Sequence, residues 1–350
     1  MKRWMIYGAN GYTGRLCVAE ARNRGLEPVL AGRNRAQIEQ LARENALEAR
    51  IFDLADAAKA AEHMQDIDAV LHCAGPFSHT AQPMLRACVA SKTNYLDITG
   101  EIPVFEYVHR SGGKWTRAGI AAIPGVGFDV VPSDCLAAML KEALPEATRL
   151  VLAFTSPKMR ISPGTAKTVA EGITYGTYIR RNGRLASIPA GSKTATIPFE
   201  SGEKLVVAIS WGDVSTAFFS TGIPNIEVYT TVKPAQLRQI KMAQRFKWFL
   251  SMRFVQRAMQ RRIEKKVHGP TESQRAASWA ELYGEATNDA GGKAAITLRT
   301  PDGYDLTADA AVTAVQRVLE GLPPGAYTPS KAFGSEFVLG LKGVSHHRVE

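Results

Sequence analysis

The amino-acid sequence predicts an α/β protein in which an N-terminal Rossmann-type parallel sheet is joined to a second, α+β domain with a mostly antiparallel sheet. Two observations predict this fold class. Over residues 1–130, short apolar runs alternate with longer stretches of helical composition, which is the pattern of repeated βαβ units. After Pro132, longer apolar runs follow one another with few helices between them, which favours antiparallel strands.

The first domain is expected to contain six strands separated by helices. The strands are expected at residues 4–7, 28–31, 49–52, 69–73, 95–98 and 120–124. The intervening stretches, such as 38–45 and 81–90, have the composition of helices. Because neighbouring parallel strands need a long crossover connection, this alternation predicts a single parallel sheet.

The second domain is expected to open with a helix at Val131, with Pro132 in its first turn and Asp134 near the positive end of its dipole. Strands are then expected at residues 150–155, 205–210, 226–232, 279–286 and 294–299. A helix over residues 307–320 is expected to end at Gly321.

These elements predict three regions. Residues 1–130 form an NADP-binding domain, and residues 131–305 form a domain for substrate binding and dimerisation. Residues 306–350 form a helix and tail that pack back across the domain boundary. The expected partners are a small-molecule substrate and a second copy of the chain.

The composition is that of an ordinary globular protein, with 45% hydrophobic and 22% charged residues. No run approaches the roughly 18–20 apolar residues that cross a bilayer. The first strand leads directly into a glycine loop and leaves no room for the apolar region of about 7–15 residues in a signal peptide. We therefore expect a cytoplasmic protein whose four scattered cysteines are buried free thiols. Their spacing predicts no metal site.

The glycine loop at residues 8–14 follows an apolar strand and precedes a helix, which is the context of a dinucleotide-binding fingerprint. Gly8 permits the tight turn, Gly11 lets the backbone approach a pyrophosphate, and Gly14 lets the helix pack closely on the sheet. The alternative is a purely structural glycine turn. The expected cofactor contacts of this loop are Gly8, Asn10, Gly11, Tyr12, Thr13 and Gly14.

The end of the second strand favours NADP(H) over NAD(H). NAD-binding domains place an acidic residue there to accept hydrogen bonds from the ribose 2′-hydroxyl. Here the strand runs into Gly32, Arg33, Asn34 and Arg35 without a carboxylate. Arg33 lies where a guanidinium pairs with a 2′-phosphate, and Asn34 is expected beside it. The alternative is that Arg33 and Arg35 are ordinary solvated arginines at a helix entrance.

Two further loops follow strands and are expected at the ligand-binding edge of the sheet. Asp53 follows the third strand and is expected near the adenine, or alternatively caps the next helix. Ala74, Gly75 and Pro76 follow the fourth strand and are expected near the nicotinamide, or alternatively form a plain tight turn.

Several motifs together resemble the saccharopine dehydrogenase-like oxidoreductase family, and within it the bacterial trans-acting enoyl reductase-like branch. The most specific of them is Gly125-Val126-Gly127-Phe128-Asp129-Val130-Val131-Pro132-Ser133-Asp134. The others lie at residues 7–14, 31–33, 72–77, 95–101, 164–168, 220–224 and 325–329. The resemblance implies a two-domain NADP-binding oxidoreductase with a variable substrate domain. Some members reduce an imine between amino acids, and others reduce a carbon–carbon double bond in a lipid precursor.

The predicted function is therefore NADP(H)-dependent hydride transfer to or from a C=N or C=C bond of a small molecule. Asp129 and Ser133 are the candidate catalytic residues, with capping of the following helix as the alternative role. Lys167, Tyr175 and Tyr178 are further candidates from the second domain. Two other functions stay open: an NADP-binding regulatory sensor without turnover, and a peripheral membrane reductase that acts on a lipid.

Residues 233–266 contain eleven basic residues and one acid, so this segment carries a net charge of +10 and the rest of the chain is neutral. On a helix, Arg253, Arg257, Arg261 and Lys265 form one row, beside a second row at Phe246, Leu250, Phe254 and Ala258. Such a segment predicts weak contact with an anionic membrane or an acidic partner. A solvated helix or a subunit contact is the alternative, and nucleic acid is disfavoured because no recognised module surrounds the segment.

Overall fold

A computed structural model describes residues 2–158, 160–166, 176–250 and 252–349. Contacts within the chain divide it into two compact units. The first unit combines Met1–Val131 with Tyr304–Phe337. The second combines Pro132–Gly303 with Val338–Glu350.

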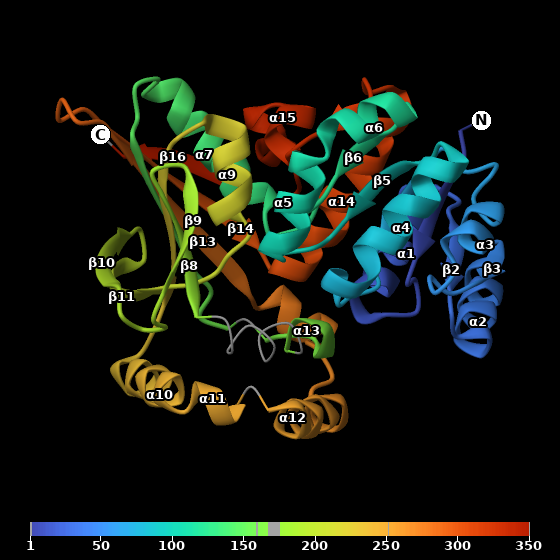
Figure 1. The fold of residues 1–350 in the computed structure, drawn as a ribbon, viewed down its shortest axis with the longest axis horizontal. Helices are drawn as coiled ribbons and strands as arrows, with labels where there is room; N and C mark the ends of the chain where they lie inside the picture. Colours follow the sequence, from blue (N-terminus) through green and yellow to red (C-terminus); the bar gives the residue numbers. More distant parts are fainter. Residues whose placement is uncertain (1, 159, 167–175, 251, 350) are drawn as a thin grey trace. The chain divides into compact units, whose positions relative to one another are not determined.

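The first unit contains a seven-stranded sheet in the order β15-β6-β5-β4-β1-β2-β3 (Figure 1). Every pairing along this order is parallel. The six expected strands are confirmed with ends shifted by at most one residue, and a seventh comes from the C-terminal part of the chain. The strands are β1 (Trp4–Tyr7), β2 (Val29–Gly32), β3 (Ala49–Ile51), β4 (Ala69–His72), β5 (Asn94–Asp97), β6 (Ala121–Ile123) and β15 (Gly325–Ala326).

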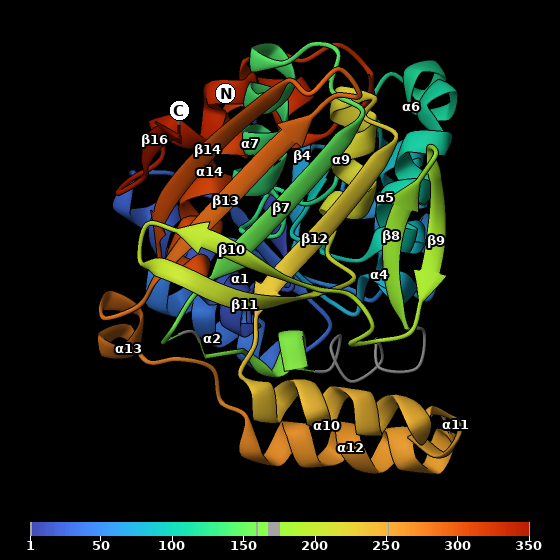
Figure 2. The same cartoon turned by 90° about the vertical axis from the view of Figure 1, so that its left-hand side faces the viewer.

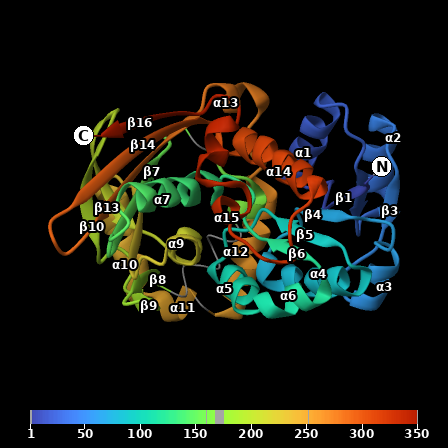
Figure 3. The ribbon, with the colours of Figure 1, turned by 90° about the horizontal axis from the view of Figure 1, so that it is seen from above.

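Helices cover both faces of this sheet. Figure 3 shows α1 and α14 on one face and α4, α5 and α6 on the other. All four residues of β1 are buried, as expected for a parallel strand that is covered on both sides. The helices of this unit are α1 (Tyr12–Asn23), α2 (Arg35–Asn45), α3 (Ala57–Glu62), α4 (Phe77–Ser91), α5 (Ile102–Arg110), α6 (Gly112–Ala118), α14 (Gly303–Glu320) and α15 (Pro329–Phe333).

The second unit contains a larger sheet, in which β10-β11-β12-β7-β13-β14-β16 are neighbours and the β8–β9 hairpin pairs with β12. Among the described strands the pairing of β12 with β7 is parallel and the others are antiparallel. The expected fold class is therefore confirmed. The strands are β7 (Arg149–Thr155), β8 (Thr177–Arg181), β9 (Arg184–Ile188), β10 (Thr194–Phe199), β11 (Gly202–Ala208), β12 (Asn225–Thr231), β13 (Trp279–Thr287), β14 (Lys293–Pro301) and β16 (Ser345–Val349).

Each face of the second sheet packs against a different layer. On one face, Gly284 of β13 lies so close to Leu136 and Leu140 of α7 that a Cβ at position 284 would be 2.7–2.9 Å from them. On the other face, β10 and β11 cross over the central strands (Figure 2) and bury Phe199 against Tyr283 and their neighbours. The helices are α7 (Val131–Ala143), α9 (Asp213–Thr221), α10 (Pro234–Arg245), α11 (Lys247–Leu250), α12 (Arg253–Lys266) and α13 (Glu272–Ala276).

All four cysteines are free, and Cys17, Cys88 and Cys135 are buried as expected, whereas Cys73 is half-buried. Within the described parts of the chain, no helix is long and apolar enough to cross a membrane. No group of three or more His, Cys, Asp or Glu side chains is placed there to hold a metal ion.

Candidate functional site

The glycine loop between β1 and α1 has a backbone that only glycine accommodates at two positions. Gly8 has a φ of +81°, and a Cβ there would lie 2.8 Å from the Cβ of Ala74. A Cβ at Gly14 would lie 2.3 Å from the carbonyl oxygen of Gly8. The loop therefore brings α1 against the end of β1 and against the loop after β4.

The N-terminus of α1 is open to an anion. Gly11 occupies the N-cap without a side-chain hydrogen bond, and the first turn contains no acidic residue. The backbone N–H groups of the first helical turn lack partners within a helix, and the helix dipole places positive charge there. This end of α1 fits the pyrophosphate of a dinucleotide.

Asn10 and Asn34 link the glycine loop to α2. The Asn10 Nδ2 donates to Gln37 Oε1 at 2.7 Å, and Asn34 Oδ1 accepts from the Gln37 backbone N–H at 3.2 Å. Asn34 is therefore the N-cap of α2. The side chains of both asparagines hold the loop in place, and their contact with a cofactor stays a prediction.

Arg33 and Arg35 differ although both follow β2. Arg33 is exposed and forms no ion pair with the residues that the structure describes, whereas Arg35 pairs with Glu39 at 2.8 Å. The end of β2 has no carboxylate. Arg33 is thus the guanidinium of this loop whose charge is not neutralised by an ion pair.

Asp53 lies at the same edge of the sheet but does not cap α3. Its carboxylate accepts from the Ala55 N–H at 2.9 Å, and the cap of α3 is Asp56. The alternative capping role for Asp53 is therefore wrong. Burial, the larger cause, and the charge of Asp53 together raise the pKa of Tyr7 to about 12, while the charge of Arg33 acts in the opposite direction. The charges of Asp53 and Arg33 therefore both act on the Tyr7 hydroxyl at the end of β1.

The loop after β4 is fixed by a threonine on α4. Thr80 Oγ1 donates to the carbonyl of Ala74 at 2.7 Å, and the Gly75–Pro76 peptide is cis. His72 Nε2 lies 3.0 Å from Thr80 Oγ1. Burial lowers the pKa of His72 to about 3, so this histidine is neutral at physiological pH.

The N-terminus of α4 is filled by a residue of the chain itself. The two carboxylate oxygens of Glu101 accept from the backbone N–H groups of Phe77 and Ser78, each at 2.8 Å. No pattern in the sequence predicts this role for Glu101. The signal that could have found it is the acid at the end of the motif over residues 95–101, but its partners lie more than 20 positions earlier.

Asp97 fastens the loops that follow β5 and β6. Its Oδ1 accepts from the N–H groups of Thr99 at 2.9 Å and Gly125 at 2.8 Å, and its Oδ2 accepts from the Tyr95 hydroxyl. Burial raises the pKa of Asp97 to about 6, although these hydrogen bonds act in the opposite direction. Asp97 therefore orders the backbone between β6 and α7.

The two candidate catalytic residues lie in different surroundings. The Asp129 carboxylate lies over the backbone of Gly100, where an added Cβ would be 1.9 Å from Oδ2. Ser133 is buried in the second unit, and its hydroxyl donates to Asp213 at 2.6 Å. Asp129 thus lies beside the loop after β5, whereas Ser133 forms a hydrogen bond in the core.

Of the three candidate residues on the second domain, the structure describes one. Lys167 and Tyr175 lie outside the described residues. Tyr178 is a half-buried residue of β8, and its backbone N–H donates to Ser210 Oγ at 2.9 Å. Tyr178 stays a candidate on the grounds given by the sequence.

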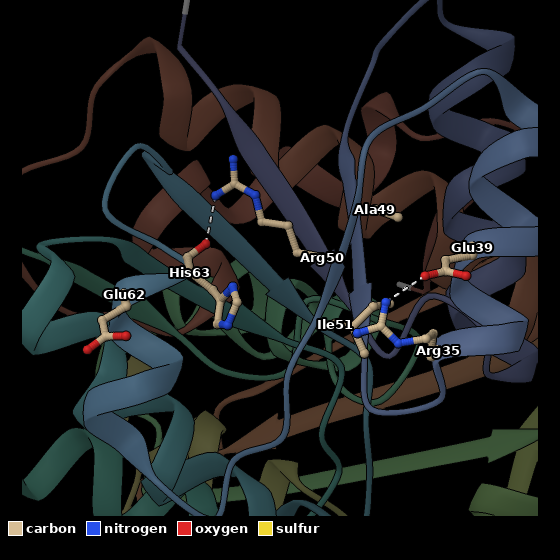
Figure 4. Close-up of a pocket in the computed structure, with 7 residues that line it drawn as sticks. All are labelled: Arg35, Glu39, Ala49, Arg50, Ile51, Glu62 and His63. Carbon is tan, nitrogen blue, oxygen red and sulfur yellow. Dashed lines mark hydrogen bonds and ion pairs between the residues drawn. The ribbon is translucent and has the colours of Figure 1, made fainter.

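An open cavity of about 400 Å³ lies at the outer edge of the first sheet (Figure 4). Arg50 extends along it and donates to the backbone carbonyl of His63 at 2.7 Å, and it also pairs with Asp66 at 2.6 Å. None of the residues predicted to bind the cofactor lines this cavity. Its lining residues are Arg35, Glu39, Ala49, Arg50, Ile51, Glu62 and His63.

The glycine cradle, the open helix N-terminus and the parallel sheet define the first unit as an NAD(P)H-binding domain of the Rossmann type. A family model described as NAD(P)H-binding matches residues 8–123. A human protein named saccharopine dehydrogenase-like oxidoreductase is 26% identical over 150 residues, which cover 37% of this chain and 35% of that protein. The chain therefore spans about a third of the length of the curated relatives that it matches.

Two further comparisons extend this result. A putative trans-acting enoyl reductase of Mycobacterium tuberculosis is 30% identical over 142 residues, which cover 37% of this chain and 33% of that protein. The apo structure of saccharopine dehydrogenase (L-Glu forming) from Saccharomyces cerevisiae covers 100% of both chains with a TM-score of 0.68 at 11% identity. The resemblance to saccharopine dehydrogenase-like oxidoreductases is confirmed, and the chain has the saccharopine dehydrogenase fold.

Proposed function

We propose that this chain is an NADP(H)-dependent oxidoreductase that transfers a hydride to or from a C=N or C=C bond of a small molecule. The names of its relatives, an oxidoreductase and a putative enoyl reductase, support this reaction class. The choice of NADP(H) over NAD(H) rests on Arg33 at the end of β2. This side chain is exposed and forms no ion pair with the described residues.

The charge of Arg33 favours a cofactor with a 2′-phosphate. A guanidinium forms two parallel hydrogen bonds to a phosphate, and such charge-assisted pairs are stronger than neutral hydrogen bonds. A ribose 2′-hydroxyl would instead need a carboxylate as acceptor, and β2 ends without one. Gly8, Gly11 and Gly14 would hold the pyrophosphate against the start of α1.

Substitution of Arg33 tests the cofactor preference. We expect Arg33→Ala to weaken NADPH binding by about 10–100-fold, because a charge-assisted pair contributes about 1.5–3 kcal/mol. NADH binding should change by less than about threefold. Arg35→Ala is the matched control, since Arg35 already pairs with Glu39. Fluorescence titration with both cofactors measures these affinities, and equal losses for NADPH and NADH would show that Arg33 does not bind the 2′-phosphate.

The bound dinucleotide would supply the hydride, and the chain would position the substrate and provide the proton. We assign the substrate-side role to Asp129, which lies at the carboxyl edge of the sheet beside Gly100. NADPH oxidation with panels of imines and enoyl thioesters tests the reaction class. Asp129→Asn should lower kcat by about 100-fold without a change in NADPH affinity. Tight NADPH binding without turnover on either panel would instead support a regulatory sensor.

We further propose that this activity is cytoplasmic and that the second unit provides the substrate and dimerisation surfaces. The size of the native particle, measured by light scattering, tests the dimer. A monomer at micromolar concentration would exclude a stable homodimer.

A further inference from the structure

Exposed large apolar side chains gather in one short part of the second unit. Met242, Phe246, Trp248, Phe249 and Phe254 have exposed fractions of 63%, 55%, 64%, 43% and 65%. Among the described residues, Ile161 is the one other large hydrophobic side chain of this kind, at 37%. Single exposed apolar residues are ordinary, but a concentration of this size marks an interaction surface.

Three of these rings form one cluster at the corner between α11 and α12. The ring centroids of Trp248 and Phe249 are 6.0 Å apart, and those of Phe249 and Phe254 are 6.3 Å apart. Both pairs meet edge to face. The rings thus form a compact apolar projection rather than separate flat platforms for stacked bases.

Helix α10 presents a second, basic surface beside this cluster. Its Leu237, Ile240 and the Cγ of Lys241 face Gly191, where a Cβ would be 3.5 Å, 3.2 Å and 3.1 Å from them. Arg238, Met242 and Arg245 recur at helical spacing on a different face and are exposed. Figures 1 and 2 show α10, α11 and α12 following one another at one end of the second unit.

The net charge of residues 233–266 indicates which kind of partner binds this surface. Residues 233–266 carry a net charge of +10, so two copies of the segment would repel each other in a self-association. An acidic surface complements the charge, and five exposed apolar side chains favour a surface into which rings can insert. Aromatic and basic side chains together are the composition of segments that lie in the interface of an anionic bilayer.

We propose that residues 233–266 are a docking surface for anionic phospholipid bilayers. Trp248, Phe249 and Phe254 insert at the level of the headgroups. The two arginines and the one lysine of α10 contact the lipid phosphates. The proposal does not depend on the enzymatic reaction, because its readout is vesicle binding.

Flotation of the full-length protein with lipid vesicles tests this surface. One set of vesicles contains phosphatidylcholine alone, and the other adds about 30% phosphatidylserine. We expect at least about tenfold tighter binding to the anionic vesicles, and weaker binding at high salt. Equal binding to both vesicles, or none, overturns the proposal.

Two triple variants locate the contact. The variant Trp248→Ser/Phe249→Ser/Phe254→Ser and the variant Arg238→Gln/Lys241→Gln/Arg245→Gln should each lose at least about tenfold in vesicle affinity. NADPH affinity and the circular dichroism spectrum of both variants should match those of the unmodified protein, which shows that they fold.

The matched control removes three exposed charges from the first unit. Arg43→Gln/Lys59→Gln/Arg117→Gln makes the same change in net charge and should alter vesicle affinity by less than about twofold. An equal loss of vesicle affinity in this control would show that the effect depends only on the net charge of the protein, and it would overturn the proposal. Retention by single-stranded RNA but not by vesicles, or dissociation of a dimer in the aromatic variant, would assign the surface to another partner.

Discussion

The N-termini of α1 and α4 lie at the same edge of one parallel sheet, because these helices follow the neighbouring strands β1 and β4. They differ in what covers their backbone N–H groups. Helix α1 has Gly11 as its N-cap, without a side-chain hydrogen bond and without an acid in its first turn. Helix α4 donates its first two N–H groups to Glu101. The same local geometry is therefore open to a ligand in α1 and satisfied internally in α4.

Helices α2 and α3 at the same edge extend the contrast. Asn34 caps α2 and Asp56 caps α3, each through its side chain. Every helix that follows a parallel strand offers the positive end of its dipole to an anion. Side chains cover this site in α2, α3 and α4, whereas α1 and α5 begin without a side-chain cap. The glycine loop before α1 is therefore the feature on which we base the proposal that the pyrophosphate of a dinucleotide binds there.

The largest expected effect comes from closing the open site. In Gly14→Ala the new Cβ would lie 2.3 Å from the Gly8 carbonyl oxygen, so the backbone of the loop must shift. We expect NADPH to bind about 100-fold more weakly, which is about 2.7 kcal/mol. Isothermal titration calorimetry measures this loss. Gly113→Ala is the control, because its Cβ would meet the flexible end of Arg117 at 3.4 Å. Binding within about threefold of the unmodified protein would place the pyrophosphate elsewhere.

The open N-terminus of α1 could be predicted from the sequence, whereas the covered N-terminus of α4 could not. The glycine spacing of residues 8–14 encodes a local turn and close approaches between atoms only a few residues apart. Glu101 caps α4 through a tertiary contact, and no periodicity marks its partners. Likewise β15 has two residues and pairs with β6 some 200 positions away, so it carries no strand pattern of its own.

The N-cap of α3 shows that sequence patterns can also fail to identify contacts between residues that are close together in the chain. Asp53 and Asp56 are both acids before α3, and either fits the preference for an N-cap. The choice depends on which residue the helix begins after, and sequence patterns place helix ends poorly. The second sheet repeats this lesson, because β8, β9 and β10 are short and partly exposed, so their apolar alternation is weak.

A second effect, of intermediate size, is expected from two buried titratable residues at the ends of β4 and β5. His72 at the end of β4 has its pKa lowered to about 3 by burial, and Asp97 at the end of β5 has its pKa raised to about 6. Below pH 6.5 the unfolded chain protonates His72 before the folded chain does, so stability falls with acidification. Asp97 acts in the opposite direction between about pH 6 and pH 4, because the folded state binds its proton first.

Removal of the histidine should expose the opposing contribution of Asp97. Relative to the unmodified protein, we expect His72→Gln to gain about 2 kcal/mol of stability at pH 5 compared with pH 7. Denaturant unfolding at the two pH values measures the difference. His79→Gln, at an exposed position of α4, is the control. Identical pH dependences for His72→Gln and the unmodified protein would show that the folded state accepts a proton on His72.

The smallest expected effect comes from weakening the closed site. Glu101→Gln keeps one acceptor oxygen for α4 but removes the negative charge at the helix dipole. We expect a loss of about 1 kcal/mol in the free energy of unfolding, and an NADPH affinity within about threefold. Glu39→Gln is the control, because its ion pair with Arg35 is exposed and should contribute less than about 0.5 kcal/mol.

The direction of any change in NADPH affinity shows whether the dinucleotide uses the N-terminus of α1 alone or also that of α4. If the dinucleotide also used the N-terminus of α4, the Glu101 carboxylate would repel its phosphates, and its removal would tighten NADPH binding by more than about tenfold. That result would contradict the assignment of the pyrophosphate to α1 alone. A loss of stability with unchanged affinity would instead show that Glu101 serves the fold by occupying a site that the same geometry leaves open in α1.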